Sequence, residues 1–338
     1  MRILIQGYNT CCQNKAGGVQ TKIRSYVEAL KKRKSLEVKY FDMFMDKLVD
    51  YDVIHFFKLT TEHLALMQYA KSAGIKIVLS SIVPNNGKAA IQANLLLGSI
   101  LPIHPVQQLS QWALQMCDAI IPETRLEAQF IYEAYGINKD KMKIIPNGIS
   151  NSLFGGNPVL AMREFGIKEK VILLPALIDR NKNQLSVICA LRDTDIPVLI
   201  MGGCNPSAVA YMEQCKREAT DNIKFTGWVQ HGSPLWASCY ALAKVVTLPS
   251  FHEIYGNSLF EGCAAGANVV VSNVLPIAEW GLDKLILSIN PYSVRDIREK
   301  LIKAYNTPVS PELSVRVRNE YTWDAIVDKH LEVYQSVL

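Results

Sequence analysis

The stretch Thr247–Asn273, TLPSFHEIYGNSLFEGCAAGANVVVSN, has the pattern of a strand, a loop, a helix and a second strand. Its first apolar run ends at a proline, a polar loop with a glycine follows, and Asn257 or Ser258 is suited to cap a short helix through Ala265. A glycine ends that helix, and the β-branched run after it is typical of a strand covered on both faces. The stretch therefore predicts a β-α-β unit of a parallel sheet.

Two carboxylates in this stretch, Glu253 and Glu261, lie eight residues apart, one in the loop and one about a turn inside the predicted helix. Both can face the same crevice. The start of the helix favours a phosphate group, because its first turn has unpaired N–H donors and a partial positive charge. Two glutamates at this spacing are also typical of charges that merely favour the start of a helix, so the spacing alone leaves both interpretations open.

The same stretch resembles the signature of the retaining GT-B glycosyltransferases of family 4, often called group 1, which is P-S-x-x-E-x-x-G-x-x-x-x-E-A-x-x-x-G-x-P-V-V. The matching residues are Pro249, Ser250, Glu253, Gly256, Glu261, Gly266, Val269 and Val270, with Gly262 and Asn268 where the family usually has Ala and Pro. The resemblance implies that Glu253 contacts the hydroxyls of the donor sugar and that Glu261 holds the nucleotide ribose. It also implies that Gly256, Asn257 and Ser258 bind the donor.

The length and composition are those of a globular protein with two domains. The 338 residues suffice for two domains of about 150 residues, and 49% are hydrophobic and 20% charged. No apolar run approaches the roughly 18 residues of a membrane span, and the N-terminus MRILIQGYNT has no signal-peptide layout. We therefore expect a cytoplasmic protein. The eight cysteines include no C-x-x-C pair, so neither a zinc site nor a disulfide framework is predicted.

Positive charge is concentrated in the first half of the chain. Residues 1–150 contain 18 Lys and Arg against 12 Asp and Glu, whereas residues 151–338 contain 18 against 19. This excess favours an anionic partner, either a membrane surface or a phosphorylated acceptor, and it is equally typical of a solvated surface. We expect no nucleic-acid partner.

Apolar runs alternate with helical patterns along the whole chain, which predicts parallel sheets with helices on both faces. In the first half, strands are predicted at 1–6, 36–41, 53–57, 75–79, 119–122 and 143–145, with helices from 19, at 63–72 and at 125–135. In the second half, strands are predicted at 171–175, 198–201, 223–225, 245–248, 267–271 and 285–289. Two halves with this pattern predict two Rossmann-like, doubly wound domains that face a cleft.

The resemblance assigns a role to each domain and extends over nearly the whole chain. The phrases YDVIH (51–55), CDAIIPE (117–123) and IIPNG (144–148) resemble strands of the family's first domain, and Tyr321-Thr322-Trp323 resembles its F-S-W signature. It implies an acceptor-side domain over 1–150, a nucleotide-sugar-binding domain over 151–320, and a helix over 321–338 that packs back on the first domain. Gly17 and Gly18, before the first helix, lie where the family has a loop beneath the donor phosphates.

Fixed cations are expected beside the diphosphate, on which negative charge grows as the sugar is transferred. Arg180-Asn181-Lys182-Asn183 follows a predicted strand where the family has G-R-L-x-x-x-K-N. By this resemblance Lys182 grips the diphosphate, the usual arginine falls on Leu177, and we infer that Arg180 substitutes for it. Gly202, Gly203 and Gly227 follow neighbouring strands and are expected to line the nucleotide pocket.

No metal or other cofactor is predicted for the transfer. Asp193-Thr194-Asp195 has the D-x-D pattern of another glycosyltransferase fold, but it precedes a strand and so lies at the wrong end of the sheet. A histidine that family members often carry near the reaction centre is replaced by Ser80-Ser81-Ile82-Val83-Pro84. Asn85 or Asn86, or the donor phosphate itself, is left to align the acceptor, with His55, His104 and His252 as further candidates.

The segment 89–114, AAIQANLLLGSILPIHPVQQLSQWAL, contains no charged residue. We interpret it as a buried pair of helices, because apolar helical runs usually belong to a core. The alternative, which the resemblance suggests, is contact with an acceptor or with the inner face of a membrane.

Together these features predict a retaining, metal-independent glycosyltransferase. We expect it to move a hexosyl or N-acetylhexosaminyl unit from a UDP-sugar, or less favourably a GDP-sugar, to a glycan or lipid-linked glycan in surface polysaccharide synthesis. The alternative is a nucleotide-sugar-binding protein without turnover, which Leu177 and the missing histidine favour. A dehydrogenase is disfavoured, because no G-x-G-x-x-G follows the first strand.

Overall fold

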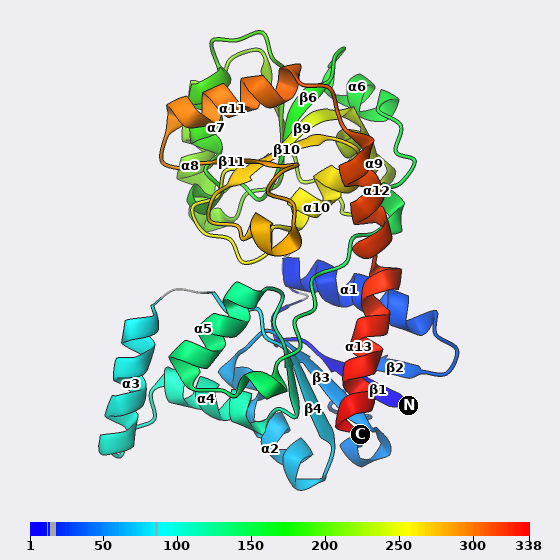
Figure 1. Cartoon of the computed structure of the whole chain (residues 1–338), viewed down its shortest axis with the longest axis vertical. Coiled ribbons are helices and arrows are strands. Elements are labelled where there is room, and N and C mark those ends of the chain that lie inside the picture. Colours follow the sequence, from blue (N-terminus) through cyan, green and yellow to red (C-terminus); the bar gives the residue numbers. More distant parts are fainter. Residues whose placement is uncertain (12, 14–17, 85–86) are drawn as a thin grey trace. The chain divides into compact units, whose positions relative to one another are not determined.

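The computed structural model describes residues 1–11, 13, 18–84 and 87–338, which form two compact units (Figure 1). Unit 1 comprises Met1–Gly148 and Trp323–Leu338, and unit 2 comprises Ile149–Thr322. The chain passes between the units at two points that lie close together. Ile149 forms a parallel bridge with Thr322, and a Cβ added at Gly148 would lie 2.4 Å from the ring of Trp323.

Unit 1 is built on a parallel sheet in the order β2-β1-β3-β4-β5. Alternate residues of β1, β3, β4 and β5 pack into different cores: Ile54 packs on one face, while Val53 and Phe57 pack on the other. Both faces are therefore covered, as the uninterrupted apolar runs predict. The strands are β1 Arg2–Gln6, β2 Glu37–Tyr40, β3 Val53–Phe57, β4 Lys76–Ser80 and β5 Ala119–Ile121.

The helices of unit 1 include one from the C-terminal end of the chain. They are α1 Gly18–Lys31, α2 Leu64–Ser72, α3 Lys88–Ile100, α4 Val106–Met116, α5 Arg125–Tyr135 and α13 Trp323–Val337. Helices α1 and α13 pack against each other, and Tyr26 and Tyr334 join them through a buried hydrogen bond between their hydroxyls.

Unit 2 has a parallel sheet in the order β11-β10-β9-β6-β7-β8, with a hydrophobic core on each face. Its strands are β6 Val171–Pro175, β7 Val198–Met201, β8 Ile223–Gly227, β9 Ala243–Leu248, β10 Asn268–Ser272 and β11 Leu287–Ile289. Its helices are α6 Val159–Phe165, α7 Gln184–Leu191, α8 Val209–Glu218, α9 Pro234–Leu242, α10 Asn257–Ala264, α11 Val294–Asn306 and α12 Pro311–Glu320. Each unit is thus a doubly wound α/β fold, as predicted.

The prediction of a strand at 143–145 is wrong. The N–H of Lys143 donates to the carbonyl of Ile120 at 2.9 Å and that of Ile145 to Pro122 at 3.0 Å, but no strand forms there. The neighbouring β5 is only three residues long and is followed by Pro122, which has no N–H to donate, so the ladder cannot extend.

The start of α10 also differs from the prediction. Gly256, with φ of 75°, occupies the capping position in place of Asn257 or Ser258. Glycine adopts this left-handed conformation without steric cost. The Ser258 hydroxyl instead donates to the carbonyl of Pro175 at 2.9 Å and ties the helix to the end of β6.

The apolar segment 89–114 is not a buried helix pair. No residue of α3 is buried, and Leu96 and Ile100 are 63% and 70% exposed. Only Ala113 and Leu114 of α4 are buried, while Ile91 and Leu95 pack partly against the core. No helix in the described part of the chain is both long and apolar enough to cross a membrane.

Candidate functional site

The two residues at the centre of the predicted site form an ion pair. Lys182 Nζ lies 2.6 Å from a carboxylate oxygen of Glu253, and the two side chains are 26% and 16% exposed. Lys182 ends a short 3-10 helix after β6, and Glu253 lies in the loop after β9. Because β6 and β9 pair directly, the loops that leave their C-terminal ends are neighbours.

Asn181 joins the two loops through hydrogen bonds. Its side-chain oxygen accepts from the N–H of His252 and its side-chain nitrogen donates to the His252 carbonyl, both at 2.9 Å. The N–H of Phe251 donates to the Asn181 carbonyl at 2.9 Å. These bonds hold Lys182 and Glu253 in register before any ligand binds.

Glu261, in the second turn of α10, is only 8% exposed. Its carboxylate accepts a hydrogen bond from the hydroxyl of Tyr240, and a ring nitrogen of His231 lies 3.2 Å from its other oxygen. Burial and then the charge of Glu261 raise the pKa of Tyr240 well above its usual value, so the hydroxyl stays a donor. A carboxylate has about four acceptor positions, so Glu261 retains capacity for the two hydroxyls of a ribose.

His231 and Tyr240 were not predicted from the sequence. His231 comes four residues after Gly227, which was expected to line the nucleotide pocket, so its position was a usable signal. Tyr240 belongs to α9 and reaches α10 only through the packing of unit 2, which sequence spacing does not predict.

The start of α10 suits a phosphate group. Among the described residues, no side chain caps the first turn of this helix, and the turn contains no acidic residue. The N-terminal amides and the partial positive charge there favour an anion. Glu253 and Glu261 flank this turn. Glu253 pairs with Lys182, whereas Glu261 contacts Tyr240 and His231.

The glycines assigned to the donor pocket have different structural roles. A Cβ at Gly202 would lie 1.9 Å from the carbonyl of Ala176, so the loop after β7 packs directly on the loop after β6. Gly227 has φ of 68°, which favours glycine, while Gly203 would tolerate a Cβ at 3.6 Å from Trp228. Gly17 lies outside the described residues, and Gly18 is the first residue of α1 in unit 1.

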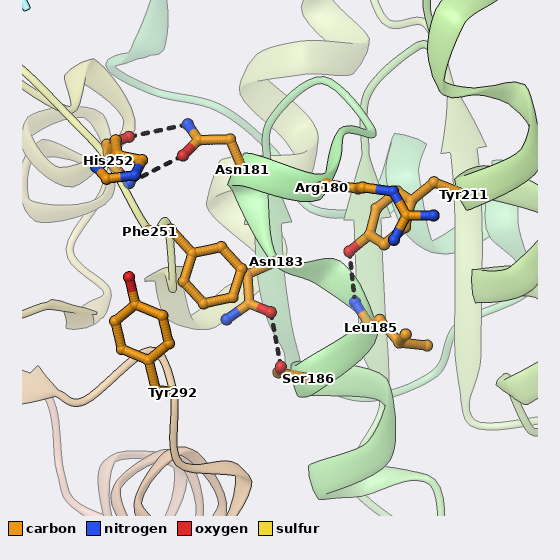
Figure 2. A pocket seen from close by; sticks show the side chains of 9 residues that line it. All are labelled: Arg180, Asn181, Asn183, Leu185, Ser186, Tyr211, Phe251, His252 and Tyr292. Atoms are coloured by element: carbon orange, nitrogen blue, oxygen red, sulfur yellow. Dashed lines mark hydrogen bonds between the residues drawn. The ribbon is translucent and has the colours of Figure 1, made fainter.

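Arg180 has different neighbours from Lys182. Its guanidinium carbon lies 5.4 Å from the centre of the Tyr211 ring, and it lines a cavity of about 510 Å³ that neither Lys182 nor Glu253 lines (Figure 2). The difference arises because residues of the short 3-10 helix point in different directions. The substitution of Arg180 for the arginine at Leu177 stays a prediction.

The D-x-D pattern Asp193-Thr194-Asp195 does not contribute to the candidate site. Asp193 pairs with Arg298, whose hydrogen bond lowers the pKa of that carboxyl. It precedes β7, at the amino ends of the strands. Among the described residues, no group of three or more His, Cys, Asp or Glu side chains is placed to hold a metal ion.

In unit 1, the loop after β4 is held by a buried carboxylate. Glu127 accepts from the hydroxyl of Ser81 and from the N–H groups of Val83 and Glu123, each at 2.7 Å. Burial and the neighbouring Glu123 raise the pKa of Glu127 to about 7. Ile82 in this loop has φ of 47°, an unusual conformation for a β-branched residue that these bonds maintain.

The histidine candidates are dispersed. His55 is buried, with its ring nitrogens 2.6 Å from the Tyr334 hydroxyl and 3.0 Å from the Ser80 hydroxyl, and burial lowers its pKa well below the usual value. It belongs to the core of unit 1. His104 is exposed and contacts Gln108, and His252 lines the cavity beside Arg180. Asn85 and Asn86 lie outside the described residues.

A comparison with protein families matches residues 168–307 to the glycosyl transferases group 1. The chain is 27% identical over 247 residues to a D-inositol 3-phosphate glycosyltransferase of Thermomonospora curvata, covering 64% of this chain and 56% of the relative. It is 22% identical over 245 residues to a mannosylfructose-phosphate synthase of Agrobacterium fabrum, covering 65% of this chain and 53% of the relative. The matched part thus spans little more than half of these curated relatives.

Solved structures match almost the whole chain. The sucrose-phosphate synthase of Thermosynechococcus elongatus has a TM-score of 0.77 and 16% identity, covering 99% of this chain and 98% of its own. HepE of Anabaena, solved in complex with UDP and glucose, has a TM-score of 0.74 and 15% identity, covering 99% of this chain and 100% of its own. At these identities the structural likeness establishes the fold, which is GT-B.

Proposed function

We propose that the chain is a retaining glycosyltransferase that uses a UDP-sugar, because residues 168–307 match the glycosyl transferases group 1 and the chain has the GT-B fold. The enzyme moves a hexosyl or N-acetylhexosaminyl unit to a hydroxyl of a glycan or lipid-linked glycan. The observation that carries this proposal is the ion pair of Lys182 and Glu253 in the loops beside the start of α10, whose capping residue is a glycine without a side chain.

The proposed chemistry follows from charge. The bond between the anomeric carbon and the diphosphate oxygen breaks while the acceptor oxygen bonds to the same face of that carbon. Lys182 and the first amides of α10 stabilise the negative charge on the leaving UDP. Glu253 accepts hydrogen bonds from the sugar hydroxyls, and Glu261 accepts those of the ribose. The acceptor proton passes to the leaving phosphate oxygen.

In this scheme no divalent metal is required, because Lys182 and the helix start supply the counter-charge. The test is the rate of UDP release with excess EDTA and with added Mg²⁺ or Mn²⁺. Equal rates support the proposal. A rate that disappears with EDTA and returns with a metal contradicts it.

Two classes of acceptor are considered. The exposed Leu96, Leu97 and Ile100 of α3 and the basic charge of residues 1–150 support a lipid-linked acceptor reached at the cytoplasmic face of a membrane. The names of both curated relatives include a phosphorylated polyol or sugar, which supports a small phosphorylated acceptor instead. Acceptor panels therefore need both classes, with and without vesicles of anionic lipid.

The deciding assay measures UDP and GDP release from a panel of nucleotide sugars with each acceptor. Glu253→Ala should abolish acceptor-dependent release, while Glu164→Ala, an exposed carboxylate of unit 2, should leave it unchanged. NMR of the product should show the anomeric configuration of the donor. Tight donor binding without turnover on any acceptor would instead support the sugar-binding protein that Leu177 and the missing histidine suggest.

A further inference from the structure

A cavity of about 510 Å³ lies in unit 2 beside the predicted donor site (Figure 2). This volume is within the range of about 300–1,000 Å³ that is typical of ligand sites. Loops that leave the C-terminal ends of β6, β9 and β11 form it, together with α7 and α8. Its lining residues are Arg180, Asn181, Asn183, Leu185, Ser186, Tyr211, Phe251, His252 and Tyr292.

Two aromatic walls face the cavity. Phe251 and Tyr292 lie on one side in Figure 2, with ring centres 4.9 Å apart, and Arg180 and Tyr211 lie on the other. Tyr292 is 73% exposed although its ring contacts Phe251, so part of the ring is open to a ligand. Aromatic rings beside amide and hydroxyl groups suit a sugar, because its C–H faces pack on rings and its hydroxyls bond to polar groups.

The cavity is fixed before a ligand binds. The buried side chain of Asn183 donates to the carbonyls of Pro249 and Pro291, at 3.1 and 2.8 Å, and accepts from the Ser186 hydroxyl at 2.6 Å. These two prolines precede the loop residues Phe251 and Tyr292, so Asn183 ties both loops to the start of α7. A rigid site loses less conformational entropy when it binds.

The lining carries one fixed charge, which is positive. It contains Arg180 and no carboxylate, and no acid among the described residues lies within ion-pair distance of Arg180. The neighbouring Asp179 accepts a hydrogen bond from the N–H of Asn181 at 2.8 Å. A guanidinium without an acidic partner, packed on the Tyr211 ring, is suited to bind a carboxylate or phosphate.

We propose that this cavity binds an anionic sugar, a hexose that carries a carboxylate or a phosphate, at a site separate from the donor. The sugar ring stacks on Tyr292 and its charged group binds Arg180. The site is independent of the reaction proposed above, because Lys182, Glu253 and Glu261 do not line the cavity.

The test is a calorimetric titration of the full chain with glucuronate, glucose 6-phosphate, glucose and inorganic phosphate. We expect at least one of the two anionic sugars to bind, and glucose and phosphate to bind about tenfold more weakly, since each makes only part of the contacts. The comparison of glucuronate with glucose 6-phosphate distinguishes the two sources of charge.

Variants locate the site. Arg180→Ala should weaken anionic-sugar binding about tenfold or more, and Tyr292→Ala should weaken it several-fold. Arg217→Ala, an exposed arginine later in α8, and Tyr69→Ala, an exposed tyrosine in unit 1, are the controls and should change nothing. UDP affinity should be the same in Tyr292→Ala and in both controls, which keeps this test separate from that of the donor site.

Three results would overturn the proposal. The first is no saturable binding of either anionic sugar while UDP still binds. The second is binding that Arg180→Ala and Tyr292→Ala leave unchanged. The third is displacement of the bound anionic sugar when UDP is added, which would make the cavity part of the donor site.

Discussion

Replacing Lys182 with methionine should reduce transfer far more than it reduces stability. Lys182 and Glu253 are partly exposed, so their ion pair contributes at most about 1 kcal/mol to folding. For a unit of this size that corresponds to a fall in Tm of about 2–4 °C. A preorganised donor lost from a transition state costs about 2.7–4 kcal/mol, or roughly 100–1,000-fold in kcat.

The assay is UDP release at saturating donor, with thermal unfolding measured on the same samples. Lys224→Met, an exposed lysine on β8, is the matched control and should keep wild-type kcat and Tm. If Lys182→Met keeps kcat within about threefold of wild type, Lys182 does not stabilise the leaving diphosphate. A loss of activity that follows a large fall in Tm would show that the pair is only structural.

Three further substitutions test contacts inside the two units, two in unit 2 and one in unit 1. Tyr240→Phe removes the donor to Glu261 and should lower the free energy of unfolding by about 1–2 kcal/mol and weaken UDP binding, measured by urea denaturation and calorimetry. Gly262→Ala places a Cβ 2.7 Å from that of Val246 and should cost about 1–3 kcal/mol in urea denaturation, with partial recovery in the double variant with Val246→Ala. Because the pKa of Glu127 is raised from 4.5 to about 7, the folded state binds more protons than the unfolded state between these values. The unfolding free energy of wild type relative to Glu127→Gln should therefore fall as pH rises from about 4.5 to 7, and a constant difference would contradict the assignment.

The sequence predicts the strands most accurately where they are buried on both faces. The predicted bounds 53–57, 171–175 and 198–201 are those of β3, β6 and β7, because charged residues, prolines or glycines bound these largely apolar runs. Helix α3 shows the limit of this argument. Its composition does not tell a core helix from one that rests on the surface, since hydrophobicity alone does not state which face has a partner.

Part of the candidate site was also predictable. Lys182 and Glu253 follow strands that pair directly, and the carboxyl ends of parallel strands meet at one edge of a sheet. The direction of Arg180 was not predictable, because it depends on the turn of a single 3-10 helix. The partners of Glu261 come from α9 and the loop before it, which only the packing of unit 2 brings to α10.

The most direct measurement is a crystal structure of the protein with UDP bound. The account predicts diphosphate oxygens within hydrogen-bonding distance of Lys182 Nζ and of the first amides of α10, with the ribose hydroxyls on Glu261. UDP that binds with its diphosphate on Arg180 in the aromatic cavity, or with its ribose away from Glu261, would contradict it.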